Sequence, residues 1–500
     1  MRSMKPPVEK KEGKLVIHCK RGERHNATDL TQRALIAAGC PVYYRGGFLV
    51  HPLWRWEKTS ENNRDALVTM IMKLSSARLS YMTGKHAAIY QKWNARGRKW
   101  EVIDPPNDVI EQLLELGHWD FPTIKGIVNS PAMRPDGSLL TVQGYDPETQ
   151  LWFKSSSDIE LPEIPQRPTR DDALRALELL TNLLEGFPFK DDISKVVAIA
   201  GLMTPVLRGA FEFAPLFLIL APEPGSGKSY LVYVIGTLAT GRLPSAVPLT
   251  EKPEEMDKRL SAAAFKALPI LHLNNLDFDL ESALLCQMVT EGIVDIRPFG
   301  KNDQLISCDC RGTTIFVNGN NIRIVGDLVR RTLTARLDAK IECPETRTFK
   351  FDPVDYIKMD RGKYLAAVFT IVRAYLAAGC PKVEAAPLAG FDGWSRMVRQ
   401  PLMWLGLSDP VKSMEDARKQ DPVREALRQR IDELVKAFGI DRPAGDGALV
   451  ATVIGARSGA HSFVYARCGT WIESFKMHPD QILLPKAEAA DRSVAALLLK

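Results

Sequence analysis

The stretch that decides the fold is Pro215-Leu-Phe-Leu-Ile-Leu-Ala-Pro-Glu-Pro-Gly-Ser-Gly-Lys-Ser229. Its apolar run, 216–220, is continuous rather than alternating, which is typical of a strand buried on both faces of a parallel sheet. The run ends at a pair of prolines and a glycine loop, and a helix is expected directly afterwards, over 230–238. Strand, glycine loop, Lys-Ser and helix in this order predict a phosphate-binding P-loop.

Each residue type in this loop suits phosphate chemistry. Glycines allow backbone N–H groups to close around phosphates, and the helix N-terminus favours negative charge. Lys228 is expected to reach the β- and γ-phosphates of ATP, and the Ser229 hydroxyl to be a ligand of Mg²⁺. Pro222 stands where the motif usually has its first glycine, and an ordinary strand–turn–helix connection is the alternative. The predicted nucleotide-binding residues are Gly225, Ser226, Gly227, Lys228 and Ser229.

Composition indicates a globular chain with several cores. The 500 residues are 45% hydrophobic, and no apolar run approaches the ~18 residues of a membrane span. The first residues contain no apolar signal core, and none of the eight cysteines forms a CxxC pair. We therefore expect reduced thiols, no structural zinc, no membrane association and a cytoplasmic location.

Charge is distributed unevenly along the chain. Residues 1–100 contain 20 Lys and Arg against 7 Asp and Glu, which leaves −7 for the other 400 because the total is +6. Within this basic region, 85–100 interleaves cations with Trp93 and Trp100. Cations for phosphates and flat rings for bases are typical of surfaces that bind single-stranded nucleic acid. The alternatives are a solubilising basic face and aromatic residues that belong to a core.

Further polar residues follow strands after the P-loop. A buried strand over 268–273 ends in Asn274 and Asn275, and another over 313–317 is followed by the amides of 318–321. Such positions lie at the carboxyl edge of a parallel sheet, where ligands bind. Asn320 is therefore a candidate to orient the attacking water. Between these strands, 294–309 is expected to form a hairpin with Lys301 at its tip.

This ordered series resembles the AAA+ core of superfamily 3-type helicases. More closely, it is similar to the helicase portion of primase–helicases of phages and integrative elements. The similar segments are the P-loop, Asn274-Asn275, the hairpin, "GNN" (319–321) with "VGDLVRRTLTARLD" (325–338), "RGGFLVHP" (45–52), "DPP" (104–106), 130–153 and 390–411. The resemblance covers roughly residues 30–440.

The resemblance implies an ATP-hydrolysing DNA helicase that acts as a ring, expected to be hexameric, on single-stranded or forked DNA. By position, Asn320 corresponds to sensor 1, and Arg330 or Arg331 to the arginine finger that reaches a neighbouring subunit. Lys301 corresponds to the hairpin lysine that grips DNA, with Arg297 beside it. No primase region is visible, so a primase would act in trans.

Together, the residue patterns and the resemblance predict an α/β fold in four parts. Charge predicts a basic N-terminal α+β region that engages nucleic acid (1–165). The resemblance implies an AAA+ P-loop core with a parallel sheet and a hairpin before sensor 1 (166–345), followed by a helical domain (346–440). Alternating strand-like runs predict a small, winged-helix-like or β-rich appendage (441–500).

One position departs from the family pattern. Asn274, with Asn275 beside it, occupies the catalytic strand end where the family usually has Asp, and an amide is a poor base without negative charge. Asp277 and Glu281 follow on the next turn as substitutes. Two further functions therefore stay open: an ATP-binding and DNA-binding assembly factor with weak or no hydrolysis, and a loader or initiator that does not unwind DNA.

Overall fold

The computed structural model describes residues 10–58, 65–155, 159–297, 305–341, 343–419, 450–454, 462–468 and 471–477. The chain divides into two compact units, residues 1–414 and 415–500. In the second unit, β20 (Val450–Ile454), β21 (Ser462–Cys468) and β22 (Trp471–Met477) form an antiparallel sheet.

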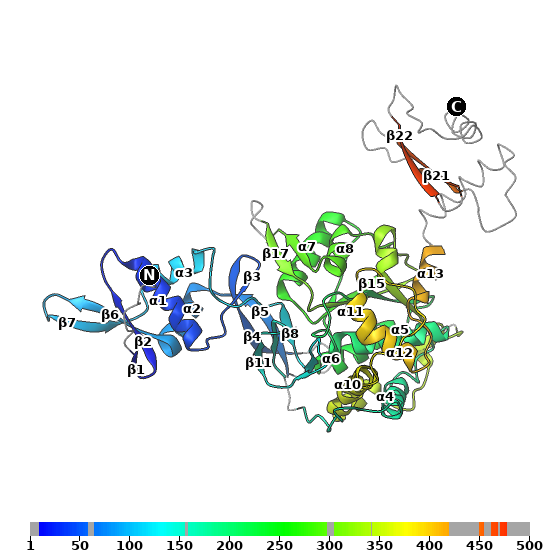
Figure 1. Ribbon diagram of the computed structural model, residues 1–500, viewed down its shortest axis with the longest axis horizontal. Coiled ribbons are helices and arrows are strands. Elements are labelled where there is room, and N and C mark those ends of the chain that lie inside the picture. The colour runs from blue at the N-terminus through cyan, green and yellow to red at the C-terminus, as the bar shows by residue number, and fades with distance from the viewer. Residues whose placement is uncertain are drawn as a thin grey trace. The chain divides into compact units, whose positions relative to one another are not determined.

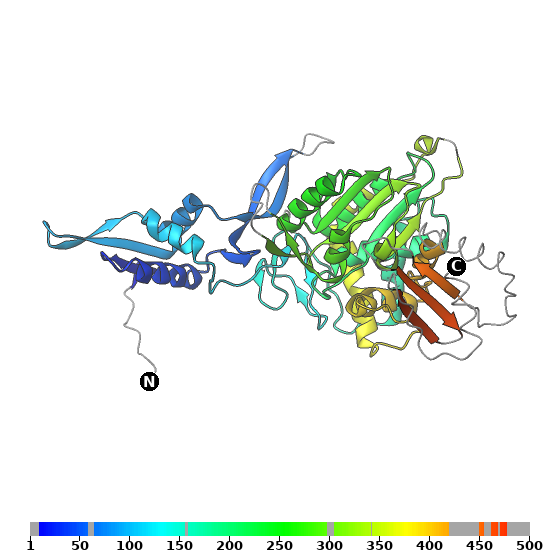
Figure 2. The ribbon, with the colours of Figure 1, turned by 90° about the horizontal axis from the view of Figure 1, so that it is seen from above.

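The first unit begins with a four-stranded sheet in the order β1-β2-β6-β7. Its strands are β1 (Lys10–Lys11), β2 (Lys14–Cys19), β6 (Ala88–Asn94) and β7 (Lys99–Ile103), and its helices are α1 (Arg24–Ala37), α2 (Ser76–Met82), the π-helix η1 (Thr83–Ala87) and α3 (Asn107–Glu115). Ile17 and Tyr90 of the sheet share one buried core with Leu35 of α1 and Ile110 of α3. The described helices and the core face of this sheet therefore share one hydrophobic core, and this part of the chain is coloured blue to cyan in Figures 1 and 2.

Smaller sheets connect this part to the rest of the unit. One is the antiparallel sheet of β3 (Tyr43–Arg45), β4 (Phe48–Lys58) and β5 (Asp65–Lys73). Five short strands follow: β8 (Gly126–Val128), β9 (Ala132–Met133), β10 (Leu139–Leu140), β11 (Gly144–Asp146) and β12 (Leu151–Phe153). Trp152, Ile127 and Tyr43 belong to one core cluster, so these two groups of strands pack together.

The central sheet has five strands in the order β14-β15-β18-β13-β19, and every described pairing in it is parallel. Its strands are β13 (Leu216–Ala221), β14 (Ala246–Val247), β15 (Ile270–Leu276), β18 (Thr314–Asn320) and β19 (Thr332–Arg336). All six residues of β13 are buried, as its continuous apolar run predicts. The expected α/β fold with a parallel sheet is confirmed.

Helices pack around this sheet. They are α4 (Arg170–Asn182), α5 (Asp192–Val206), α6 (Lys228–Thr240), α7 (Pro253–Lys266), α8 (Ala283–Thr290), α9 (Pro353–Met359), α10 (Arg361–Ala377), α11 (Asp392–Trp394), α12 (Gln400–Trp404) and α13 (Lys412–Lys419), with 3-10 turns η2 (Gly326–Arg331) and η3 (Pro344–Thr346) and the π-helix η4 (Ser395–Arg399). Side chains cap the N-termini of two of these helices: Thr169 and Asp172 form a capping box for α4, and the Asp191 side chain caps α5. None of the helices in the described part of the chain is long and apolar enough to cross a membrane.

The strand order matters for function. Strand β18 lies between β13 and β15, so the carboxyl ends of these three strands are neighbours. The glycine loop follows β13, Asn274 lies near the end of β15, and Asn318 and Asn320 lie near the end of β18. Segments separated by up to about a hundred residues of sequence therefore meet at one edge of the sheet.

Candidate nucleotide site

The glycine loop connects β13 to α6 in a conformation that its glycines make possible. Gly225 and Gly227 have φ angles of +74° and +95°, in the left-handed region that glycine adopts without strain. Lys228 is the first residue of α6 and is 9% exposed, and its Nζ donates to the Glu223 carbonyl oxygen at 3.2 Å. Burial lowers the pKa of this ammonium group, which Glu223 partly offsets. The Lys228 ammonium group and the N-terminus of α6 therefore both lie beside the loop, where they favour an anion.

Three side chains meet immediately behind the loop. The Ser229 hydroxyl donates to Oδ1 of Asn274 at 2.8 Å. Asn318 Nδ2 donates to the same Oδ1 at 2.7 Å and lies 3.1 Å from Ser229 Oγ. Ser229, just after the glycine loop, is thus held by two amides, one from β15 and one from β18.

A buried histidine stands behind these amides. His272 Nε2 lies 3.0 Å from Oδ1 of Asn318, and the His272 side chain is fully buried. Because the other end of the Asn318 amide donates to Asn274, His272 Nε2 must carry the proton and donate. Burial lowers the pKa of His272 to about 4. The imidazole is therefore neutral at neutral pH and fixes the orientation of the Asn318 amide.

The other predicted amides occupy different surroundings. Asn320 is half-buried, and its Oδ1 is buried without a hydrogen-bond partner in the structure. An orphaned acceptor at this edge is suited to bind a water or a ligand donor. Asn275 is exposed, in the left-handed conformation at φ +57°, and lies at a register shift between Leu273 and Leu276. It is not among the residues that contact Ser229.

Carboxylates are absent from the hydrogen bonds described for Ser229 and Asn274. Asp277 is exposed, and Asp279 is committed to an ion pair with Arg323 at 2.8 Å. Within the described residues, no group of three or more His, Cys, Asp or Glu could hold a metal ion. The available oxygens, Ser229 Oγ and Asn274 Oδ1, are neutral. They fit a metal that arrives with the charge of a nucleotide better than one bound by protein alone.

A cavity of about 720 Å³ opens on one side of the loop. Aromatic side chains line it together with the loop glycines: Phe187, Tyr230, Phe349 and Phe351. The Phe187 and Tyr230 rings stack with centroids 6.2 Å apart, and the Tyr230 hydroxyl donates to Asp352. Desolvation raises the pKa of Tyr230 far above its ordinary value, so it stays a donor. Such a cavity suits a flat apolar ring with polar edges.

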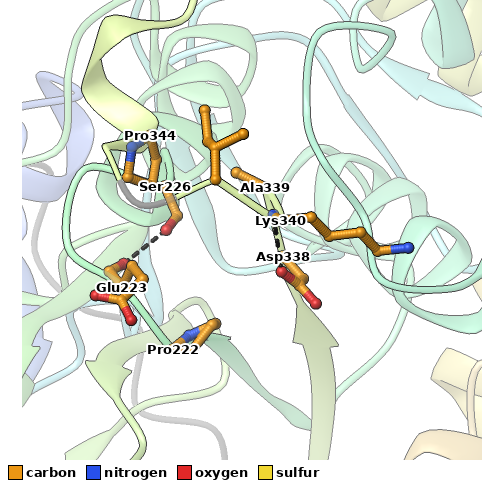
Figure 3. A pocket seen from close by; sticks show the side chains of 8 residues that line it. Pro222, Glu223, Ser226, Asp338, Ala339, Lys340 and Pro344 are labelled. Atoms are coloured by element: carbon orange, nitrogen blue, oxygen red, sulfur yellow. Dashed lines mark hydrogen bonds between the residues drawn. The ribbon is translucent and has the colours of Figure 1, made fainter.

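A second cavity of about 310 Å³ lies against the loop segment that precedes the glycines. Figure 3 shows Pro344 beside Ser226 and Glu223, with Asp338 and Lys340 on the other side of the cavity. The Ser226 hydroxyl donates to the Glu223 carbonyl at 2.6 Å, which holds the loop in its turn. Pro222 also lines this cavity.

The two candidate finger arginines, Arg330 and Arg331, differ in how exposed their side chains are. Both lie in η2 and both form ion pairs with Asp327. The Arg330 side chain is 57% exposed, whereas that of Arg331 is 13% exposed and also bonds to Cys286. Of the two side chains, that of Arg330 is therefore the one open to solvent.

The predicted hairpin is present as β16 (Ile293–Ile296) and β17 (Ile306–Asp309), paired antiparallel. Arg297 follows β16 directly and is exposed. Lys301 lies outside the described residues.

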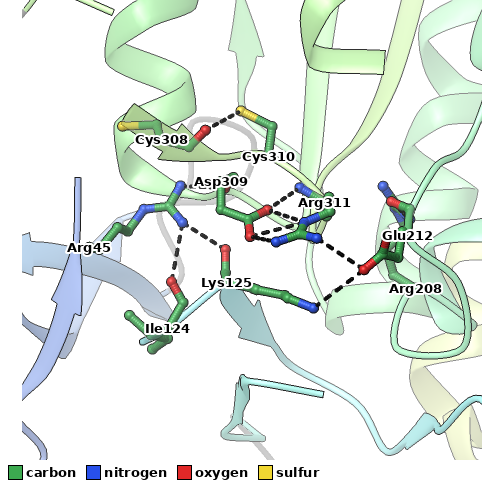
Figure 4. A network of polar contacts seen from close by, with 9 residues as sticks. All are labelled: Arg45, Ile124, Lys125, Arg208, Glu212, Cys308, Asp309, Cys310 and Arg311. Atoms are coloured by element: carbon green, nitrogen blue, oxygen red, sulfur yellow. Dashed lines mark hydrogen bonds and ion pairs between the residues drawn. The ribbon is translucent and has the colours of Figure 1, made fainter. Parts of the chain in front are cut away.

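The base of this hairpin is tied to the N-terminal strands by Arg45 (Figure 4). The Arg45 guanidinium is 3% exposed and donates to five carbonyl oxygens rather than to a carboxylate. The acceptors belong to Ile124, Lys125, Ala264, Phe265 and Asp309. Beside it, Arg311 pairs with Asp309 at 2.6 Å and with Glu212 at 3.0 Å. This network joins β3, the end of α7 and β17.

Sequence reasoning missed three parts of this site. Asn318 and His272 were not singled out, although each lies two residues before a predicted amide and therefore on the same face of its strand. The aromatic cavity was also missed, because its walls come from 183–187, the P-loop and 344–353. The two-residue spacing of His272 and Asn318 from the predicted amides could have revealed them. No pattern in the sequence could have revealed the cavity.

Comparisons with known proteins add little. No family model matches the chain, and no curated protein matches it. Among the solved structures that match is the apo C-terminal region of NrS-1, with 14% sequence identity, a TM-score of 0.33 and coverage of 68% of each chain.

Proposed function

We propose that this chain is a P-loop ATPase that unwinds or moves along DNA, as one subunit of a ring. The observation that carries the proposal is the Ser229 hydroxyl, held between Asn274 and Asn318 directly behind a glycine loop. A serine at this position, with a lysine one residue earlier, is the arrangement that P-loop proteins use for Mg²⁺–nucleotide.

The nucleotide would lie across the loop. Phosphates would meet Lys228 and the backbone N–H groups of the loop, and the base would enter the 720 Å³ aromatic cavity. Ser229 would be a direct ligand of Mg²⁺, with Asn274 accepting from a metal-bound water. When bound, the ion would neutralise charge on the β- and γ-phosphates. The orphaned Oδ1 of Asn320 supports its role in orienting the attacking water.

Oligomer formation and DNA contact complete the proposal. Arg330 is exposed and would act on the nucleotide of a neighbouring subunit, while Arg331 anchors η2 through Asp327. Lys301 and Arg297 would contact single-stranded or forked DNA from the hairpin. A hexameric ring and a primase supplied in trans are part of the same proposal.

One observation favours a second candidate function. The hydrogen bonds described for Ser229 involve only amides, so no carboxylate polarises a metal or activates water there. The chain would then be an ATP-binding assembly factor or loader on DNA with weak hydrolysis. This second function involves the same nucleotide and DNA as the first. The two functions differ only in the rate at which ATP is hydrolysed.

ATP turnover with and without single-stranded DNA separates the two functions, and strand displacement on a forked substrate tests unwinding directly. A motor should show turnover that DNA stimulates. An assembly factor should bind ATP with negligible turnover under both conditions. Lys228→Ala is the control, because it removes the loop cation and should abolish ATP binding. If this variant binds labelled ATP as tightly as the parent, the P-loop proposal is wrong.

A further inference from the structure

Among the described residues, the helices beside the N-terminal four-stranded sheet share their core with one of its faces. Ile17, Ala88 and Tyr90 point into this core, which includes residues of α1 and α3. Side chains alternate along a strand, so the neighbours of these residues must point to the opposite face. By the strand register, that face carries Val16, His18, Ile89, Gln91, Trp93, Trp100 and Val102.

Aromatic rings are organised on this open face. Trp93 and Trp100 are cross-strand partners, and their centroids lie 5.5 Å apart at 67°. Trp100 stacks in turn on His18, at 4.1 Å and 16°. Trp93 remains 48% exposed and Val102 66% exposed. Because about half of the Trp93 side chain remains exposed, its burial contributes less to stability than that of a core tryptophan. An exposed ring supported by two others is instead typical of a binding surface.

Positive charge lies at the rim of these rings. In 10–20 and 88–103, the segments that carry the four strands, eight Lys or Arg stand against two Glu. Arg96 and Arg98 are exposed in the β6–β7 turn, next to the end of the sheet where Trp93 lies, and the exposed Lys92 and Lys99 belong to the same strands but point to the other face. Glu101 is engaged by Lys99 and by Asn94, so it adds little negative potential on the ring side.

We infer that the open face of the sheet β1-β2-β6-β7 binds single-stranded nucleic acid, with Trp93 as the base-stacking residue. A sheet with stacked aromatic side chains on its free face and cations at the rim can take unpaired bases and their phosphates together. Paired bases in a duplex hide their flat surfaces, so the site selects single strands. This site is separate from the nucleotide site and from the hairpin, and goes beyond the proposed ATPase function.

The test is fluorescence anisotropy of a labelled oligothymidylate with the full chain and no nucleotide. Trp93→Ala should weaken binding by about 10-fold, the usual effect of losing one stacked base, and Trp93→Phe should retain most of the affinity. Tyr81→Ala is the matched control, because Tyr81 is 52% exposed but lies on α2. Its affinity should equal that of the parent. Replacing Arg96 and Arg98 with Ala should reduce the log–log salt slope by about one unit each.

Further outcomes sharpen the inference. A duplex should bind more weakly and respond little to Trp93→Ala. Oligouridylate that binds as well as oligothymidylate also supports the site, because stacking does not read the sugar. Equal losses for heparin and for oligothymidylate in Trp93→Ala would overturn the inference, and so would unchanged binding by a folded Trp93→Ala variant. Because no nucleotide is present, these results stand even if the chain proves unable to bind ATP.

Discussion

In the proposed ATPase, Asn274 is the residue on which hydrolysis would depend most directly. Its Oδ1 accepts from the Ser229 hydroxyl and from Asn318 Nδ2, so a carboxylate could replace the amide and keep both bonds. We expect Asn274→Asp to increase ATP turnover at limiting Mg²⁺ by about 10-fold or more, because a negative charge beside the metal is worth several kcal/mol. Steady-state turnover against Mg²⁺ concentration measures it.

Asn275→Asp is the matched control for that substitution. It adds the same charge one residue away, on an exposed side chain outside the Ser229 contacts, and should change turnover little. Equal behaviour of the two variants would mean that Asn274 does not lie at the metal, and that the role belongs to the turn of Asp277.

His272 is expected to act through Asn318 as a positioning residue. His272→Leu removes the donor to Asn318 Oδ1 and should lower turnover while leaving ATP affinity nearly unchanged. His272→Gln offers an amide donor at similar reach and should restore much of the activity. Equal loss of turnover in both variants, or equal loss of ATP binding, would assign His272 to packing alone.

The same histidine predicts a pH dependence of stability. Burial holds the pKa of His272 at about 4, whereas an unfolded His titrates near ~6.5. The unfolded state therefore binds the proton first, so stability is full above ~6.5 and falls as pH drops towards 4. Between pH 7 and 5, the free energy of unfolding should fall by about 2 kcal/mol more in the parent than in His272→Gln. Urea unfolding at both values of pH measures the difference, and identical pH dependence would contradict it.

At the scale of elements, the hairpin β16–β17 is the part that would couple ATP hydrolysis to DNA in the proposed function. Lys301→Ala should leave basal ATP turnover unchanged, abolish strand displacement, and lower the log–log salt slope of DNA binding by about one unit. Arg297→Ala, just beyond β16, should have a smaller effect of the same kind. Unchanged unwinding by Lys301→Ala would leave the hairpin a structural role only.

The scale of elements also shows where sequence reasoning works. The strand before the glycine loop, the hairpin and the amides near the end of β18 were predictable, because each signal is contiguous in the chain. The contact between Ser229, Asn274 and Asn318 was not, because it depends on β18 lying between β13 and β15. Local patterns indicate that strands exist, whereas their order follows from how helices cover the two faces of the sheet.

At the scale of the whole molecule, the proposed ring makes a prediction about Arg330. If Arg330 completes a neighbour's site, Arg330→Ala should lower turnover by ~10³-fold or more while sparing ATP binding. Mixed with the parent, it should reduce activity more steeply than its share of the subunits. Arg175→Ala is the matched control, since Arg175 is a 69% exposed arginine with an acidic partner three residues away. A linear loss with the fraction of Arg330→Ala would argue against a shared site.

The Arg45 contacts have a consequence for synthesis of the chain. Its partners Ala264 and Asp309 lie 219 and 264 residues further along the sequence. At ribosomal speeds of about 5–20 residues per second, Asp309 follows Arg45 by roughly 10–50 s. During that interval the N-terminal strands can fold, but the guanidinium that will later be buried must stay in water. The contact between these strands and the hairpin therefore forms late in synthesis. Until then, chaperones are expected to shield the exposed surfaces.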